Sequence, residues 1–232
     1  MHYVLGVDIG GTFTDFSLLD KDGHIALWKE ATTPKNPTEA IQRGIRSMAE
    51  QAEMSLEKFL DRLDLFVHGS TIATNTVIQR NGPKTALLCT EGFRDVIHFR
   101  DGFKPDRYNI QLQPSEDFIP RNLRIPIKER VNYTGEVVAP LDEESVKAAD
   151  AKLKNAGVES VAVAFLWSIM NAEHERRVKA LIEEELPGVP VVLSSDVLPM
   201  IREWERTTCT VLSARTTGTP EWSLEPKASQ CT

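Results

Sequence analysis

The chain has few of the features that would assign a protein to a membrane or nucleic-acid class. No apolar run in the sequence approaches the ~20 residues that a membrane-spanning helix needs. Basic residues are not in excess, because 27 Lys and Arg stand against 34 Asp and Glu, which gives a net charge of −7 at pH 7. That charge argues against general nucleic-acid binding. We therefore expect the partner to be a small molecule or another protein.

Cysteine is also scarce. Cys89, Cys209 and Cys231 are far apart and form no CxxC pair, which argues against a disulfide framework or a zinc knuckle and fits a reducing compartment. The first residues, Met1–Leu5, have no basic region before their apolar stretch, so we expect no signal peptide. These observations predict a cytoplasmic protein.

What the chain does have is an ordinary globular composition, with 232 residues of which 41% are hydrophobic, enough for a substantial core. In the first part of the chain, the residue pattern predicts three strands followed by a helix that begins at Asn36-Pro37. Leu65–His68 is predicted to be a short buried strand. The later part alternates helices with apolar strands such as Val158–Phe165, which is typical of a parallel or mixed sheet covered by helices. From Arg215 to Thr232 no periodicity remains, and we expect a disordered or aberrant tail.

The stretch GVDIGGTFTD, Gly6–Asp15, places an aspartate and two glycines where one strand ends and the next begins. Gly10 and Gly11 allow consecutive backbone N–H groups to face one anion, and the hydroxyls of Thr12 and Thr14 can add donors. The pattern is not a GxxxxGK[ST] or a GxGxxG motif. The competing interpretation is a glycine hairpin whose threonines serve strand propensity.

Two acidic residues flank this turn. Asp8, at the end of its strand, is suited to hold a hydrated Mg²⁺, since Mg²⁺ keeps most of its waters and takes one or two carboxylates. Asp15 is interpreted either as a second such group or as a residue that orients the loop. We take Asp8 as a catalytic and metal-binding candidate.

A second group of polar residues follows the strand at Leu65–His68. His68 at the strand end, with Ser70 and Thr71 at a helix N-terminus, suits an anion or a polarised carbonyl; the alternative is a helix cap beside a packed histidine. Asn75, one turn later, would line the same face. Arg94 is a weaker candidate for a substrate carboxylate or phosphate, because a local Arg–Asp surface pair is the simpler interpretation.

With these residues, the sequence resembles a known family. Gly6–Asp15 resembles the first phosphate loop of the actin-like ATPase and sugar-kinase superfamily, in the form found in the hydantoinase A/5-oxoprolinase family, which includes subunits of acetone and acetophenone carboxylases. The further matching stretches, which extend the likeness from Val4 to Ala214, are HGSTIATNTVIQRNGPKTALLCTEGFRDV (His68–Val96), ERVNYTGEVVAPLDEESV (Glu129–Val146), GVESVAVAFLWS (Gly157–Ser168), NAEHERRV (Asn171–Val178) and REWERTTCTVLSA (Arg202–Ala214).

The resemblance implies ATP-dependent chemistry on an amide, cyclic amide or ketone, in which phosphorylation activates the substrate oxygen before hydrolysis or carboxylation. It implies a second large subunit as partner. It also implies that Asp8 and the hairpin bind Mg·ATP. His68 is kept as a second catalytic candidate from its position at the strand end, not from the resemblance. The phosphate-binding residues implied are Gly10, Gly11, Thr12 and Thr14. From their positions in the sequence we add Asp15 as a cofactor-binding candidate and Ser70, Thr71, Asn75 and Arg94 as substrate-binding candidates.

The fold implied is α/β, with a ribonuclease-H-like lobe at 1–98, a lid-like loop at about 99–125 and an inserted α/β module at about 126–198. Residues 1–214 resemble the family's N-terminal domain. The second lobe of the superfamily carries its own Asp-Gly-Gly loop and the adenosine pocket, and no stretch after Ala214 resembles either. An isolated half-cleft binds nucleotide weakly, so we expect little or no catalysis by the chain alone. The alternatives are a small-molecule kinase of the same superfamily and a non-catalytic fragment that docks onto a partner subunit.

Overall fold

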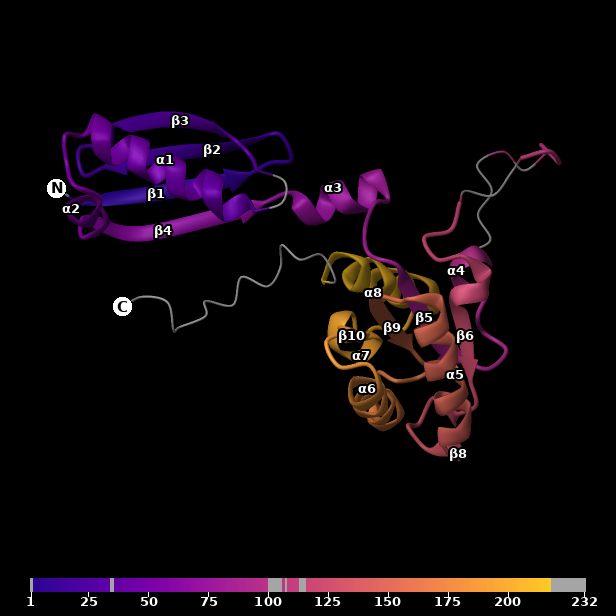
Figure 1. Ribbon diagram of the computed structural model, residues 1–232. Helices are drawn as coiled ribbons and strands as arrows, with labels where there is room; N and C mark the ends of the chain where they lie inside the picture. Colours follow the sequence, from indigo (N-terminus) through magenta and orange to yellow (C-terminus); the bar gives the residue numbers. More distant parts are fainter. Residues whose placement is uncertain (1, 34–35, 100–105, 107, 113–115, 218–232) are drawn as a thin grey trace. The chain divides into compact units, whose positions relative to one another are not determined.

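The structure is a computed structural model that describes residues 2–33, 36–99, 106, 108–112 and 116–217, with nothing inferred for the side chains of Pro37 and Ile72. The described chain divides into two compact units, one ending at Gln79 and one beginning at Arg80 (Figure 1). Each unit has its own sheet and its own hydrophobic core. None of the described helices has the length and apolar character needed to cross a bilayer.

The first unit is built on a four-stranded sheet with the order β3-β2-β1-β4. β1, β2 and β3 form an antiparallel meander, and β4 pairs in parallel with β1. A parallel neighbour requires a crossover connection, which α1 and α2 supply, and α3 follows β4. The bounds are Tyr3–Ile9 for β1, Phe13–Asp20 for β2, Ile25–Ala31 for β3, Pro37–Gln51 for α1, Leu56–Leu60 for α2, Leu63–Ser70 for β4 and Ile72–Gln79 for α3.

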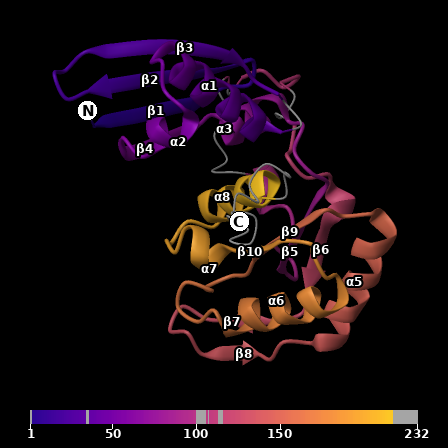
Figure 2. The ribbon, with the colours of Figure 1, turned by 60° about the vertical axis from the view of Figure 1, so that its left-hand side comes forward.

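Helix α1 covers one face of this sheet (Figures 1 and 2). As predicted, Asn36 is its N-cap residue and Pro37 its first residue. A Cβ on Gly44 would lie 2.2 Å from Cζ of Phe16, so the glycine lets the helix approach the sheet closely. The buried side chains beneath the helix alternate with exposed ones along β1 and β2: they are Tyr3, Leu5, Val7, Ile9, Phe16 and Leu18.

The prediction that Leu65–His68 is a buried strand is wrong. In β4, Leu65, Phe66, Val67 and His68 are all exposed. Two causes combine: β4 is the last strand of the sheet, and no described element covers the sheet face opposite α1. The prediction of burial depended on the apolar run alone, and in the described part of the chain no element covers these side chains.

The second unit is built on a parallel sheet with the order β10-β9-β5-β6. This confirms the parallel sheet predicted for the later part of the chain. The strand at β5 was assigned to the first part from sequence, but it is a central strand here, fully buried and paired with β6 and β9. The bounds are Thr85–Thr90 for β5, Arg124–Ile127 for β6, Ser160–Ala164 for β9 and Val191–Leu193 for β10.

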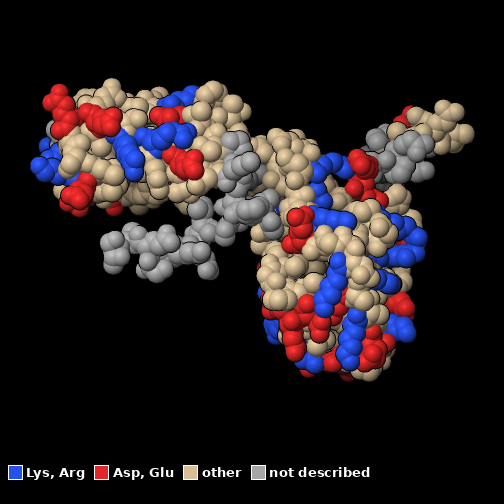
Figure 3. Space-filling view, in the orientation of Figure 1, with Lys and Arg blue, Asp and Glu red and all other residues tan. Residues whose placement is uncertain are grey.

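Helices cover both faces of the second sheet, with α8 against β9 and β10 on one face and α5 and α6 on the other (Figure 2). Asp142 caps α5 by accepting the N–H of Glu144, and Gly157 ends it at φ 61°. Charges of both signs are interspersed over the surface around α5 and α6 (Figure 3). The bounds are Glu143–Ala156 for α5, Glu173–Glu185 for α6 and Glu203–Thr217 for α8; the smaller elements are Val96–Phe99 (α4), Arg121–Leu123 (η1), Arg130–Val131 (β7), Val137–Ala139 (β8) and Ser194–Val197 (α7).

Two predicted segments fall partly outside the described residues. In the stretch predicted to be a lid-like loop, 99–125, residues 100–105, 107 and 113–115 are not described, and its end carries η1 and the start of β6. The predicted tail begins three residues too early, because α8 continues through Arg215 to Thr217. Arg215 donates to the carbonyl oxygens of Phe118 (3.1 Å) and Arg80 (3.0 Å), which ties the last turn to the second unit. The rest of that tail lies outside the described residues.

Candidate functional site

The candidate site is the hairpin Gly10–Thr12, which joins β1 to β2. The N–H of Gly10 donates to the carbonyl oxygen of Phe13 at 2.9 Å, which closes the turn. A Cβ on Gly10 would lie 2.8 Å from that same oxygen, so the turn requires glycine there. Gly11 and Thr12 are exposed. The hairpin is therefore open to a ligand and is not packed beneath other side chains of its unit.

Thr32, just after β3, holds the hairpin from behind. Its N–H donates to the carbonyl oxygen of Thr12 (3.0 Å) and its hydroxyl donates to that of Gly10 (2.9 Å). The hydroxyl of Thr14 lies 2.9 Å from the Thr32 hydroxyl and, because the Thr32 proton is already used, donates to it. Thr14 is fully buried. The structure thus places Thr14, predicted to contact phosphate, in the support of the hairpin.

The hydrogen-bond donors left to the hairpin are its outer amides. No hydrogen bond to any described residue is made by the N–H groups of Gly11 or Thr12. Successive free amides in an exposed turn form a small concavity of positive potential that suits an anion. The backbone pattern expected from the two glycines is present, with Gly11 and Thr12 rather than Gly10 supplying the free N–H groups.

Two carboxylates stand beside the hairpin on one face of the sheet. Asp8 and Asp15 are directly opposite each other in the β1–β2 ladder, so their side chains project to the same side. Asp15 is paired with Lys29 at 3.1 Å, and the Lys29 ammonium also lies 5.1 Å from the centre of the Phe13 ring. Asp8 is exposed and forms no ion pair with a described residue. Its charge is therefore available to a hydrated cation.

The end of β4 and the start of α3 lie next to the hairpin. Gly69 is the partner of Asp8 in the β1–β4 ladder, and Ser70 is the partner of Ile9. The N–H of Thr71 donates to the Ile9 carbonyl oxygen at 3.2 Å. The Asn75 side-chain amide donates to the Thr71 hydroxyl at 3.4 Å.

The same Asn75 amide nitrogen would lie 3.2 Å from a Cβ on Gly11. Among the predicted substrate residues, Thr71 and Asn75 are thus brought to the hairpin.

His68 is separated from Asp8 by the sheet. His68 pairs with Val7, whereas Asp8 pairs with Gly69, and adjacent residues of a strand project to opposite faces. The imidazole ring stacks on Phe66, with the ring centres 6.1 Å apart. The structure therefore does not bring the two predicted catalytic residues to one face.

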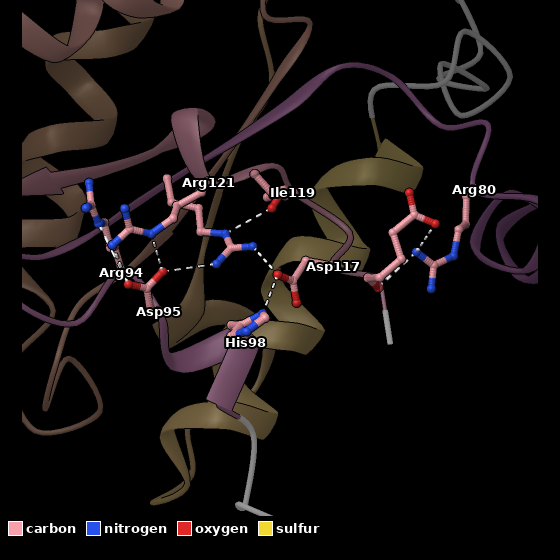
Figure 4. Close-up of polar contacts among 9 residues, drawn as sticks. Arg80, Arg94, Asp95, His98, Asp117, Ile119 and Arg121 are labelled. Atoms are coloured by element: carbon pink, nitrogen blue, oxygen red, sulfur yellow. Dashed lines mark hydrogen bonds and ion pairs between the residues drawn. The ribbon is translucent and has the colours of Figure 1, made fainter. Parts of the chain in front are cut away.

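Arg94 belongs to the second unit and takes part in an ion-pair network (Figure 4). Its Nε lies 3.9 Å from Asp95, the local pair that the simpler interpretation predicted. The centre of the network is Arg124, which is buried and contacts both Asp95 (3.3 Å) and Asp117. Asp117 also contacts His98 at 2.8 Å. A hollow of about 720 Å³ adjoins these residues.

Both acids of this network have pKa values below the ordinary range. Hydrogen bonds from Arg121 are the main cause for Asp95. For Asp117, burial acts to raise the pKa, but the hydrogen bonds from His98 and Arg124 together lower it by more. The network links α4 to η1 and β6, which come later in the sequence. We therefore interpret its residues as structural.

Sequence reasoning missed a buried polar cluster at the carboxyl ends of the second sheet. Glu129, after β6, accepts the Thr90 hydroxyl and lies 2.9 Å from Nδ1 of His174. Glu175 accepts the N–H of Phe165 (2.9 Å) and the hydroxyl of Ser194 (2.7 Å). The partners are far apart in sequence. The available indication was Glu129, two residues after the end of β6.

One exposed group in the described part of the chain has metal-ligand spacing: Asp20, Asp22 and His24. It occupies the β2–β3 turn, where Asp20 accepts the N–H groups of Asp22 (2.8 Å) and His24 (2.9 Å), and backbone hydrogen bonding from His24 is the main reason the Asp20 pKa is lowered. These hydrogen bonds give Asp20 a structural role in stabilising the turn. It lies at the opposite end of β2 from the hairpin.

Comparison with known proteins identifies the family. Residues 4–186 match the model of the hydantoinase/oxoprolinase N-terminal region. The chain belongs to the hydantoinase/oxoprolinase family. Among curated proteins it is 39% identical over 214 residues to the caprolactamase subunit alpha of Pseudomonas jessenii, covering 91% of this chain and 31% of that one. It is 38% identical over 224 residues to the acetophenone carboxylase gamma subunit of Aromatoleum aromaticum, covering 90% and 30%.

A solved structure agrees with this assignment. The crystal structure of the ATP-dependent caprolactamase from Pseudomonas jessenii matches with a TM-score of 0.80 and 39% identity, over 92% of this chain and 31% of that chain. The two curated relatives named above are subunits of enzymes, and the chain spans 31% and 30% of their lengths. The matched part corresponds to the N-terminal region of the family.

Proposed function

We propose that this chain supplies the first phosphate-binding wall of an ATP-dependent enzyme of the hydantoinase, oxoprolinase or ketone-carboxylase type. The observation that carries the proposal is the exposed hairpin, whose Gly11 and Thr12 amides bond to no described residue, next to Asp8, whose carboxylate forms no ion pair with a described residue. The order β3-β2-β1-β4, with β4 parallel to β1, supports a ribonuclease-H-like lobe of the actin-like ATPase type.

The residues at the hairpin have distinct roles in this proposal. The N–H groups of Gly11 and Thr12 and the Thr12 hydroxyl donate to phosphate oxygens. Asp8 holds the water shell of Mg²⁺ and would repel phosphate if it touched it directly. Thr14 and Thr32 keep the turn in shape. In the same proposal Asn75, whose side-chain nitrogen would lie 3.2 Å from a Cβ on Gly11, contacts the outer end of the bound phosphate chain or the substrate.

ATP supplies the phosphoryl group that activates the carbonyl oxygen of an amide, a cyclic amide or a ketone. The names of the relatives, a caprolactamase subunit and an acetophenone carboxylase subunit, support this range of substrates. In the proposal the activated substrate then reacts with water or is carboxylated, together with a second large subunit. We further propose that the chain alone has little or no turnover, because one wall of a cleft neither excludes water nor clamps a triphosphate at both ends.

The test is nuclear magnetic resonance of the ¹⁵N-labelled chain during titration with Mg·ATP. We expect the Gly11 and Thr12 amide signals to shift, whereas adenosine, which has no phosphate, leaves them in place. Gly10→Ala should remove the response, because its Cβ would lie 2.8 Å from the Phe13 oxygen and displace the turn. Shifts confined to other residues, or ATP hydrolysis by the chain alone at an ordinary enzymatic rate, would contradict the proposal.

A further inference from the structure

The sheet of the first unit carries apolar side chains on the face that α1 does not cover. The ladders place Val4, Leu19, Ile25 and Leu65 side by side across the four strands on this face. Leu27 and Val67 lie on the outer strands of the next row, where Ser17 and Gly6 separate them. We call the six apolar residues the open face. The exposed fractions are 37% for Leu19, 64% for Ile25, 75% for Leu27, 52% for Leu65 and 52% for Val67.

This pattern differs from that of a sheet with one solvated side. Such sheets alternate apolar residues toward the core with polar residues toward water. Here the α1 face is buried and apolar, and the opposite face is apolar at the end away from the hairpin, whereas Asp8, Asp15 and Lys29 occupy it near the hairpin. A contiguous exposed apolar surface of this kind marks an interaction site. The part of the sheet away from the hairpin therefore has the composition of a sheet that is covered on both faces.

The β4 edge of the sheet also has features of an interaction site. β4 pairs with β1 on one side, and no described strand pairs with its other side. It is eight residues long, and its sequence LDLFVHGS has no Lys, Arg or Pro and one acidic residue, Asp64, near its start. Charged residues, prolines and short length are the usual means by which an edge strand avoids pairing with other chains. β4 is thus a suitable edge for the addition of a strand.

We propose that the open face and the β4 edge bind one α/β polypeptide segment, the counterpart of the chain that the relatives carry outside the matched stretch. This segment lays a helix with an apolar stripe on the open face and adds a strand to β4. The argument for this occupant is length, because relatives with the same N-terminal region are matched over only about 31% of their chains. The proposal does not depend on nucleotide binding.

The position of Asp8 gives the proposal a consequence for the hairpin site. Asp8 and Asp15 project from the same face of the sheet as Val4 and Leu19, at the hairpin end. A segment that covers the open face therefore reaches the edge of the site at Asp8. It would exclude water from one side of that carboxylate and provide the opposing wall that the chain by itself lacks.

The test measures the rate at which single introduced cysteines react with a thiol reagent. Leu27→Cys and Val67→Cys report the open face, and Gln42→Cys, exposed on α1, is the matched control. Cys209 and Cys231 are replaced by serine, and Cys89 stays because it is buried. The partner is the caprolactamase subunit alpha of Pseudomonas jessenii from which the matched N-terminal stretch has been removed. In the positive control, that removed N-terminal stretch is mixed with the same partner in place of this chain.

We expect the partner to slow labelling at positions 27 and 67 by about tenfold or more, with no change at position 42. A covalent chimera of residues 1–214 with the same partner gives the second measurement. The proposal is overturned if the chimera leaves both positions as reactive as in the chain alone. It is also overturned if positions 27 and 67 become protected when the chain alone is concentrated, because a second copy is then the occupant. It is likewise overturned if the two positions are protected in the chain alone and become reactive when residues 218–232 are removed.

Discussion

Asp8 on β1 lies directly opposite Asp15 on β2, one step before the hairpin that joins the two strands. Like charges that face each other across a ladder repel, and the structure offsets one of them, because Lys29 contacts Asp15 at 3.1 Å. The two acids are therefore not equivalent. The charge of Asp8 is left for a ligand, while that of Asp15 is largely used within the sheet.

This difference predicts unequal effects on cation binding. Mn²⁺, a paramagnetic substitute for Mg²⁺, should broaden the amide signals of Gly10–Thr12. Asp8→Asn should abolish the broadening, whereas Asp15→Asn should only weaken it, because Lys29 already neutralises that carboxylate. Loss of broadening in Asp15→Asn with retention in Asp8→Asn would reverse the assignment.

The buried hydroxyl pair behind the hairpin predicts a stability effect. Thr14→Val keeps the shape of the side chain but removes the hydrogen bond to Thr32. We expect the first unit to lose about 1–2 kcal/mol of unfolding free energy and the Gly10 amide to exchange faster with solvent. Thr14→Ser, which keeps the hydroxyl, is the control for the hydrogen bond. Hydrogen exchange followed by mass spectrometry measures both, and equal protection in Thr14→Val would show that the pair does not hold the turn.

The contact of α1 with the sheet predicts that Gly44→Ala is destabilising. Alanine is the better helix former by up to about 1 kcal/mol, but its Cβ would lie between 2.2 and 2.7 Å from three atoms of the Phe16 ring. Overpacking of this kind costs about 1–3 kcal/mol, so we expect a net loss in urea denaturation. Adding Phe16→Leu should recover part of it. Gln42→Ala, on the outer side of α1, should have little effect.

The ion-pair network of the second unit predicts very different results for two of its arginines. Arg124 is 3% exposed and bridges Asp95 and Asp117, so Arg124→Met leaves two carboxylates without their buried partner. A loss of about 3–5 kcal/mol is expected. Arg94→Met removes only a half-exposed pair at 3.9 Å, with an expected loss below about 1 kcal/mol. Urea denaturation followed by tryptophan fluorescence compares them, and equal losses would remove Arg124 from the centre of the network.

Asp150 predicts a specific pH dependence. Its side chain is buried in α5 with Oδ1 unpartnered among the described residues, and burial, aided by Glu185, raises its pKa from 3.8 to about 6. The folded chain therefore holds this proton more tightly than the unfolded chain. The contribution to stability is present below pH 4 and is lost as the pH rises to 6.

Replacing the group should remove this loss. At pH 7, Asp150→Asn should raise the unfolding free energy by roughly 1–2 kcal/mol, less than the pKa difference implies because solvent screening weakens the effect. At pH 4 the variant and the parent chain should be equally stable. A variant that keeps the decrease between pH 4 and pH 6 would show that another group titrates there.

Local signals in the sequence were sufficient for much of the fold. Asn36-Pro37 and Asp142 with Gly157 mark the helix ends of α1 and α5, because caps and turns depend on neighbouring residues. The parallel sheet of the second unit was predicted from its near-continuous apolar strands. The same reasoning failed for Leu65–His68, because burial depends on which elements cover a strand.

The sequence by itself determined the position and backbone character of the Gly10–Thr12 hairpin, because a tight turn between two strands is a property of a few adjacent residues. Only the tertiary structure decided which side chains share the site. The strand pairing puts Asp8 beside Gly69 and leaves His68 on the other face. Thr14, which the sequence suggested as a phosphate ligand, is buried and bonds to Thr32, the residue after β3. These outcomes depend on register and on contacts between residues distant in the chain, which local patterns do not encode.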